Sequence, residues 1–185
     1  DMTTGIRTDG TLVSWLPDGT LLPVPAGQFT AVAVDEHDTG YGIRNGSLVY
    51  FTRNGEFVGS DAQFWTQHEP YVASWSAYGY PVVMRQDRMM LGSYAAFTGR
   101  YLSFALASAD PNNLGVGIAV RDNGSIENVT GLGWTFPDGS LPSGQFTGVV
   151  GAYYWTSFVA FRNAVPVAQC RSAVVYSAAP SVDAT

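Results

Sequence analysis

The chain has 185 residues with nine basic and fifteen acidic side chains, and its net charge of −6 has the wrong sign for a protein that binds by neutralising phosphates. This charge disfavours nucleic acid and anionic membrane surfaces as partners, and no segment approaches the roughly 20 apolar residues of a membrane-spanning helix. Apolar residues make up 46% of the sequence, which is enough for a hydrophobic core.

Short apolar stretches follow one another along the whole chain, and five of them end at an arginine. The residue before each arginine is large and apolar, and the residue two before it is small or branched, which is typical of strands. The spacings between the arginines are 37, 41, 36 and 41 residues, which indicates a repeat protein. The five are Arg7, Arg44, Arg85, Arg121 and Arg162.

A turn and a second apolar strand follow each arginine. Residues 8–10, 45–46 and 122–124 end in Asp-Gly or Asn-Gly, which supply the positive φ angles of tight β-hairpins. The third and fifth copies, at residues 86–87 and 163–164, lack the glycine. We therefore expect their turns to be longer or of another type.

A second landmark lies between the arginines. Residues 27–30 read Gly-Gln-Phe-Thr, and the same four residues recur at 144–147. Weaker copies stand at 62–65 and 99–102, and each aromatic residue is expected to start another strand. Gly and Pro are too densely scattered for any segment to be predicted as a helix.

One repeat therefore holds three or four strands in roughly 40 residues, the length of a propeller blade made from one meander. The segment 172–176 takes the place that the strand beginning at Phe29 has in its own repeat. We predict an all-β fold, with residues 1–185 forming a single domain. This domain is a five-bladed β-propeller with one blade shared between the N- and C-termini, which leaves no exposed sheet edge.

Residues 5–15, 25–34 and 42–51 resemble the RCC1-like repeat family, which includes propellers of the β-lactamase inhibitor protein II type. The resemblance implies a propeller that grips a protein partner through one face. Those relatives usually have seven blades and a His-Ser pair before the second strand. Here there are five repeats, and only His37-Asp38 approximates that pair.

The sequence offers little catalytic chemistry. It has two histidines, His37 and His68, and no Gly-x-Ser-x-Gly elbow or glycine-rich phosphate loop. We expect no cofactor and no metal site, since the loop at 35–38 lacks the alternating oxygen ligands of a calcium loop. A carboxylate pair for glycoside hydrolysis stays open as a less favoured alternative. Its candidates are Asp35, Glu36, Asp61, Glu69, Asp110 and Glu127.

The loops before the arginine-bearing strands differ most between repeats, and divergence on a regular scaffold is typical of binding sites. These loops are expected on one rim of the ring, and several are dense in aromatic residues. Such rings either cover a blade interface or form a contact surface for sugars or proteins. The predicted ligand-binding residues are Asp35, His37, Asp38, Trp75, Tyr78, Tyr80, Asn112, Asn113, Tyr153, Tyr154 and Trp155.

Two functions follow from this reading. The first is a non-catalytic, lectin-like protein that binds carbohydrate on one rim, and the second is a propeller that binds a single protein partner or inhibits an enzyme. The rim loops differ between repeats, which argues against five equivalent sugar sites. The first residue, Asp1, without methionine or signal peptide, favours a processed, secreted form, and the single Cys170 cannot form an internal disulfide.

Overall fold

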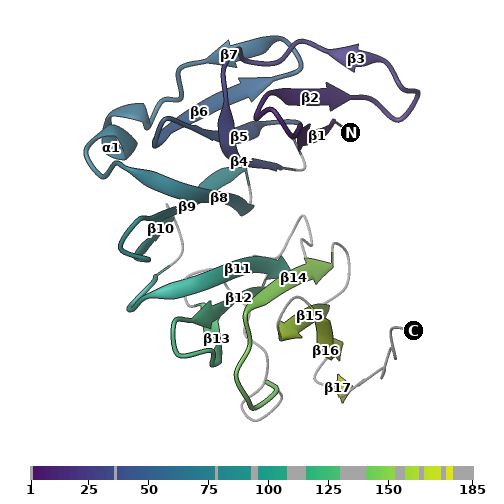
Figure 1. The fold of residues 1–185 in the computed structure, drawn as a ribbon, viewed down its shortest axis with the longest axis vertical. Coiled ribbons are helices and arrows are strands. Elements are labelled where there is room, and N and C mark those ends of the chain that lie inside the picture. The colour runs from purple at the N-terminus through teal and green to yellow at the C-terminus, as the bar shows by residue number, and fades with distance from the viewer. Residues whose placement is uncertain are drawn as a thin grey trace. The chain divides into compact units, whose positions relative to one another are not determined.

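The computed structural model describes residues 2–35, 37–77, 79–92, 96–107, 116–129, 141–152, 157–162, 165–171 and 174–176. The chain divides into two compact units, residues 1–93 and 94–185 (Figure 1). The single domain expected over residues 1–185 stays a prediction. No helix among the described residues is both long and apolar enough to cross a membrane.

The first unit contains three antiparallel sheets, and in each of them the strands follow the order of the chain. Each sheet is therefore a simple meander. The first holds β1 (Thr3–Ile6), β2 (Leu12–Trp15) and β3 (Leu21–Leu22). The second holds β4 (Phe29–Val34), β5 (Gly40–Arg44), β6 (Ser47–Thr52) and β7 (Gly55–Phe57), and the third holds β8 (Tyr71–Ala77), β9 (Tyr80–Arg85) and β10 (Met90–Gly92).

The second unit contains two more meanders of the same kind. One holds β11 (Tyr101–Ala107), β12 (Val116–Arg121) and β13 (Ile126–Val129). The other holds β14 (Gly148–Ala152), β15 (Ser157–Arg162), β16 (Val165–Arg171) and β17 (Val174–Tyr176). The prediction of an all-β fold built from antiparallel meanders is confirmed.

A fixed register links the two sequence landmarks. In three meanders the aromatic residue that opens the first strand lies directly opposite the arginine that closes the second strand. The strand pairing is irregular directly after each of these aromatic residues. The pairs are Phe29 with Arg44, Tyr71 with Arg85, and Tyr101 with Arg121.

The same aromatic position also ties one sheet to the sheet before it. Its backbone N–H donates to the carbonyl oxygen of the glycine in the preceding hairpin turn, so neighbouring meanders share a hydrogen bond. The three bonds are Phe29 to Gly10 at 2.7 Å, Tyr71 to Gly46 at 2.8 Å, and Phe146 to Gly124 at 2.8 Å.

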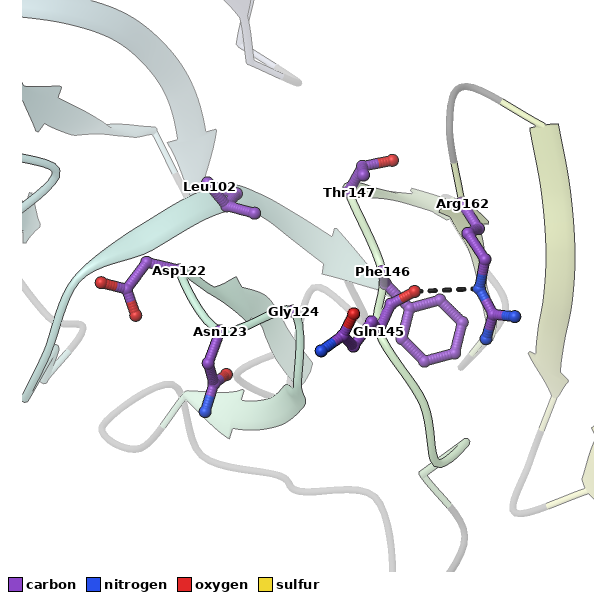
Figure 2. Close-up of a pocket in the computed structure, with 8 residues that line it drawn as sticks. All are labelled: Leu102, Asp122, Asn123, Gly124, Gln145, Phe146, Thr147 and Arg162. Atoms are coloured by element: carbon purple, nitrogen blue, oxygen red, sulfur yellow. Dashed lines mark hydrogen bonds between the residues drawn. The ribbon is translucent and has the colours of Figure 1, made fainter.

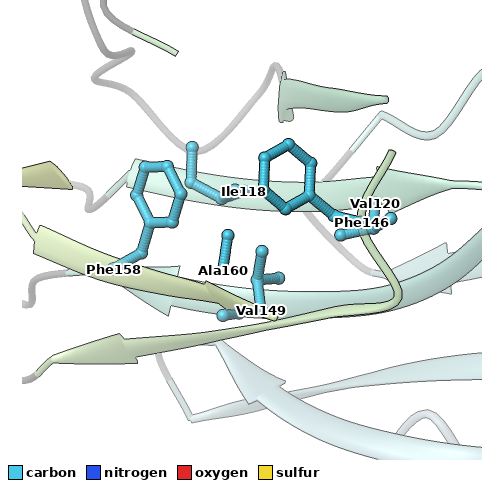
Figure 3. Close-up of a cluster of buried hydrophobic side chains, with 7 residues drawn as sticks. Ile118, Val120, Phe146, Val149, Phe158 and Ala160 are labelled. Atoms are coloured by element: carbon cyan, nitrogen blue, oxygen red, sulfur yellow. The ribbon is translucent and has the colours of Figure 1, made fainter. Parts of the chain in front are cut away.

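Hydrophobic clusters fill the space between neighbouring sheets, as expected where sheets pack face to face. Phe29 and Phe51 belong to the cluster of the first two sheets, and Trp65 and Tyr71 to that of the second and third. In the second unit a cluster lies between the two meanders (Figure 3). Its buried residues are Ala105, Ile118, Val120, Phe146, Val149, Phe158 and Ala160.

One short helix corrects the sequence reading, which predicted none. Helix α1 (Ala62–Thr66) stands where a weak copy of the Gly-Gln-Phe-Thr landmark was expected to start a strand. Its Trp65 is 1% exposed and enters the core, whereas Phe64, the residue aligned with Phe29, is half exposed. Tyr71 at the start of β8 is therefore the true counterpart of Phe29.

Hydrogen bonds explain why this segment is helical. The carboxylate of Asp61, just before the helix, accepts bonds from the Trp65 indole and the Tyr50 hydroxyl, both at 2.7 Å. The Tyr71 hydroxyl donates to the carbonyl oxygen of Trp65 at 2.6 Å. Burial raises the pKa of Tyr71 to about 12, and burial together with Asp61 raises the pKa of Tyr50. A helix this short is unstable on its own, and these contacts stabilise it within the fold.

The hairpin after Arg85 is a second correction, because it was expected to differ from the glycine-containing hairpins. The N–H of Gly10 donates to the carbonyl oxygen of Arg7 at 2.9 Å, and Arg88 donates to Arg85 at the same distance. Gly10 has φ 84° and Arg88 has φ 66°. The turn is thus of the same kind, with an arginine in the left-handed conformation that glycine usually occupies. The turn at 163–164 lies outside the described residues.

The C-terminal strand takes a different place from the one predicted. Strand β17 pairs with β16 and so forms the fourth strand of its own meander, as β7 does beside β6. Within the described part of the chain, β1 pairs with β2 alone. The sharing of one sheet by both termini is thus not a feature of the described residues.

We expect Arg88→Gly to raise the free energy of unfolding by up to about 1 kcal/mol, because it removes the cost of a side chain at positive φ. The matched control is Gln86→Gly, a position in the same turn that does not have a positive φ. This control should lower the stability. Chemical denaturation of the two variants measures both effects, and a less stable Arg88→Gly would contradict the turn assignment.

Candidate functional site

Arginine side chains lie over aromatic rings at one end of three meanders. The guanidinium carbon is 5.6 Å from the ring centre for Arg44 over Phe29, and 5.4 Å for Arg121 over Tyr101. For Arg162 over Phe146 the distance is 5.7 Å. These distances fall within the range of attractive cation–π contacts. The three aromatic residues are buried, so each ring is a fixed base for its arginine.

The glycine two residues before each ring makes room for the arginine. A Cβ at Gly27 would lie 2.9 Å from Cδ of Arg44, and a Cβ at Gly144 would lie 2.7 Å from Nη2 of Arg162. Gly99 stands in the same relation to Arg121. The Gly-x-aromatic landmark of the sequence is therefore explained by the packing of an arginine from the next strand.

The three arginines differ in their charge partners. Arg44 makes two parallel hydrogen bonds of 2.9 Å to the carboxylate of Glu56. Arg121 donates to the carboxylate of Glu127, and this bond raises the pKa of Arg121. Arg162 has no carboxylate partner among the residues that the structure describes.

An open pocket of about 620 Å³ surrounds Arg162 in the second unit (Figure 2). It forms where the turn after β12 meets the segment that leads into β14. In Figure 2, Asp122 and Asn123 stand on one side, Arg162 on the other, and Gln145 between them. The lining residues are Leu102, Asp122, Asn123, Gly124, Gln145, Phe146, Thr147 and Arg162.

The polar groups in this pocket are largely unused by the fold. The carboxylate of Asp122 and the side-chain amide of Gln145 are exposed and make no hydrogen bond to any described residue. Among the described residues, Arg162 donates only through its Nε, to the carbonyl oxygen of Gln145 at 3.0 Å. Asn123 differs, because its Oδ1 accepts bonds of 2.9 and 2.8 Å from Ser125. Its amide N–H groups remain as donors.

The first unit contains a closed copy of this arrangement. The turn glycine and the Gln-Phe-Thr segment recur around Arg44, and the threonine hydroxyl donates to the strand carbonyl in both copies. In this copy the guanidinium is occupied by Glu56. The matching residues are Gly10, Gln28, Phe29 and Thr30 in the first unit and Gly124, Gln145, Phe146 and Thr147 in the second.

Asp35, a predicted binding residue, has a structural task. It is 8% exposed, and its Oδ1 accepts the N–H groups of His37 and Thr39, both at 2.8 Å. The Tyr41 hydroxyl lies 2.8 Å from Oδ2 of Asp35 and 2.6 Å from the carbonyl oxygen of Gly79. The carboxylate therefore closes its own loop and helps to join that loop to the turn at Gly79.

Asp38 is likewise engaged inside the fold. Its carboxylate accepts the N–H of Met2, which lowers the pKa of Asp38, and it pairs with Arg53. His37 is exposed beside Gly79, where an added Cβ would lie 3.5 Å from its Nδ1. The loop at 35–39 and the turn at Gly79 are thus side by side, as the prediction of a common rim requires for these two loops.

Trp75 and Tyr80 belong to strands and not to the loop in which they were placed. Trp75 lies opposite Val82 and is half-buried, while Tyr80 lies opposite Ala77 and is 40% exposed. Tyr80 therefore presents its ring to solvent more than Trp75 does. The other predicted binding residues lie outside the described residues: Tyr78, Asn112, Asn113, Tyr153, Tyr154 and Trp155.

Three of the six carboxylates considered for catalysis have partners in the fold, namely Asp35, Asp61 and Glu127, while Glu36 and Asp110 lie outside the described residues. Asp61 binds Trp65, and Glu127 binds Arg121 and the hydroxyl of Tyr101. Burial raises the pKa of Tyr101, as does the hydrogen bond to Glu127. In the described part of the chain no three His, Cys, Asp or Glu side chains are grouped to hold a metal ion.

Comparisons with known proteins support the fold. No known family and no curated protein matches the sequence. BBS1N, solved in complex with ARL6DN and soaked with lead, is 11% identical, with a TM-score of 0.60 over 97% of this chain and 62% of its own. The WD40 β-propeller domain of Doa1 is 12% identical, with a TM-score of 0.48 over 85% of this chain and 57% of its own.

The computationally designed Ika8 protein is 18% identical, with a TM-score of 0.49 over 85% of this chain and 52% of its own. The chain thus spans 52 to 62% of the length of these three structures. At these identities the likeness to BBS1N shows the β-propeller class of fold and nothing of function. The RCC1-like resemblance stays a prediction.

We expect Gly27→Ala to lower the free energy of unfolding more than Gly55→Ala does. Both glycines have positive φ, 111° and 106°, but a Cβ at Gly55 meets nothing within 4 Å. In both variants the added Cβ strains a backbone of positive φ. Gly27→Ala must in addition displace Arg44 from its ring and from Glu56. The excess should be about 1 kcal/mol by denaturant titration. Equal losses would refute the role assigned to the landmark glycine.

Proposed function

We propose that the protein binds carbohydrate, without catalysis, in the pocket around Arg162. The observation that carries this proposal is the set of unused polar groups on Asp122, Gln145 and Arg162 around an open space of about 620 Å³. Carboxylate and amide groups can each serve two hydrogen bonds at once, which suits the neighbouring hydroxyl groups of a sugar ring. The pocket is therefore suited to a polar, multiply hydroxylated ligand.

Recognition in this pocket depends on hydrogen bonds and not on ring stacking. Phe146 is 3% exposed and already lies under Arg162, so it offers no free face to a sugar. Each hydrogen bond exchanged with water contributes about 0.5–1.5 kcal/mol. A handful of such bonds supports an affinity on the order of millimolar for a single sugar. Tight binding would then require several sugars on one ligand.

The pocket favours binding over hydrolysis. Glycoside hydrolysis uses two carboxyl groups, one on each side of the scissile bond. Asp122 is the one carboxylate among the described residues that line the pocket. A lectin-like role therefore fits this site better than an enzymatic role.

A protein partner is the second candidate, in line with the resemblance to inhibitor propellers. Phe57 on edge strand β7 is 41% exposed, and the next residue, Val58, is 86% exposed. Apolar side chains beside an open strand edge are typical of protein contacts. BBS1N, the structure with the same class of fold, was solved in complex with ARL6DN.

We further propose that the five meanders form one closed, secreted five-bladed ring. Its support is the repeated register: three later meanders open with an aromatic residue opposite the arginine of the next strand, and within the described residues the first meander has no such opening strand. In this proposal the N- and C-termini share one blade, so that the first sheet has no open edge.

Hydrogen exchange tests the ring. In the full chain we expect slow exchange of the β1 amides that do not bond to β2. In a variant that ends at Arg171, those amides should exchange faster, while the amides of β5 keep their rates. Fast exchange of the β1 edge in the full chain would show that no strand covers it.

A glycan array with matched variants tests the binding site. We expect saturable binding to a related set of glycans that is lost in Gln145→Ala and kept in Gln28→Ala, the same residue in the closed copy. Trp75→Ala should also keep the binding. Loss of binding in Trp75→Ala alone would move the site to the predicted rim, and a blank array would favour the protein partner.

A further inference from the structure

The three arginines that lie over aromatic rings form a natural comparison, because each packs on a buried ring beside a glycine while their charge partners differ. Arg44 and Arg121 each meet a carboxylate of the same chain, Glu56 and Glu127. Arg162 has the same ring contact and opens onto the pocket. The place that a carboxylate fills beside the first two arginines is thus vacant beside the third, as far as the described residues extend.

The strand register explains this vacancy. Glu127 lies on β13 opposite Ala119, and the matching residue on β16, opposite Ala160, is Ala168. The whole stretch from Gly139 to Val182 contains no Asp or Glu. The meander that bears Arg162 therefore has no acidic residue of its own to pair with it.

The guanidinium of Arg162 is nevertheless held in place. Its Nε donates to Gln145, and its face lies on the ring of Phe146. Neither terminal nitrogen bonds to a described residue, and their four N–H groups form the planar fork that matches a carboxylate. An arginine fixed in this way loses little side-chain entropy when it binds an anion, so it is preorganised for anion binding.

We infer that the ligand is an acidic sugar whose carboxylate binds Arg162 as Glu56 binds Arg44, through the two terminal nitrogens, an inference that rests on the carbohydrate function proposed above. The carboxylate would receive two hydrogen bonds from the terminal nitrogens of Arg162. The ring hydroxyls would then lie toward the amide of Gln145 and toward Asn123 and Asp122. A hexuronic acid has this combination of one carboxylate and several hydroxyls.

The rest of the pocket limits how much negative charge the ligand can carry. Asp122 lines the same pocket and repels a second anionic group, and the protein as a whole has a charge of −6. Densely sulfated polymers are therefore disfavoured. The pocket is suited to a single carboxylate on an otherwise neutral, hydroxylated ring.

The test compares matched pairs of sugars that differ in one group. The methyl glycosides of glucuronic and galacturonic acid are titrated beside those of glucose and galactose, with the dissociation constant measured by NMR. We expect at least one acid to bind about tenfold more tightly than its neutral partner. Arg162→Gln should remove that preference, and Arg162→Lys should keep part of it, because it retains the charge without the fork.

The matched control is Arg44→Gln, which removes the arginine of the closed copy and should leave the acid preference intact. The thermal midpoint of each variant shows whether it is folded, and the Arg162→Lys result still decides the question if Arg162→Gln unfolds. Equal affinity for acid and neutral partner, or a preference that persists in Arg162→Lys and Arg162→Gln alike, would overturn the inference and leave the carbohydrate function standing. Failure of every glycan on the array and of every sugar in the titrations would overturn both.

Discussion

The contact between an arginine and a buried aromatic ring is the interaction on which the repeat depends. It joins the start of one strand to the end of the next, and it requires a glycine beside the ring. For Phe29 and Phe146 the N–H of the aromatic residue also bonds to the turn of the preceding sheet. One position therefore fixes strand register, packing between sheets and the direction of a charged side chain. Each arginine–aromatic contact contributes only a modest free energy. The repeat is therefore stabilised by several weak interactions that favour the same arrangement of strands.

The spacing of arginines and the alternation of apolar residues were enough to predict an all-β repeat fold, because strand period and hairpin turns are local signals. The alignment of individual strands was less accessible. By sequence, either Phe64 or Tyr71 can be aligned with Phe29. Burial of Trp65 and its hydrogen bond to Asp61 hold the segment of Phe64 in a helix, so Tyr71 takes the position of Phe29. Such a choice depends on packing between segments, which a sequence pattern does not express.

The candidate site was missed for a related reason. Gln145 and Arg162 were recognised as parts of the repeat and interpreted as scaffold, since binding was expected in the variable loops. The rim loops supplied Asp35 and Asp38, whose carboxylates prove to be engaged in the fold. One sequence signal did distinguish the copies, namely the lack of acidic residues around Arg162. Its meaning became clear once the structure had shown that Arg44 and Arg121 are paired.

The pocket bridges a seam between two sheets. One of its walls is the turn after β12, the other is the segment entering β14, and the N–H of Phe146 donates to the carbonyl oxygen of Gly124 and so joins the two. A ligand that touches both walls would act as a clamp across this seam. Ligand binding would then stabilise the contact between these two sheets. Local opening at this contact should therefore be more frequent in the free protein than in the ligand-bound protein.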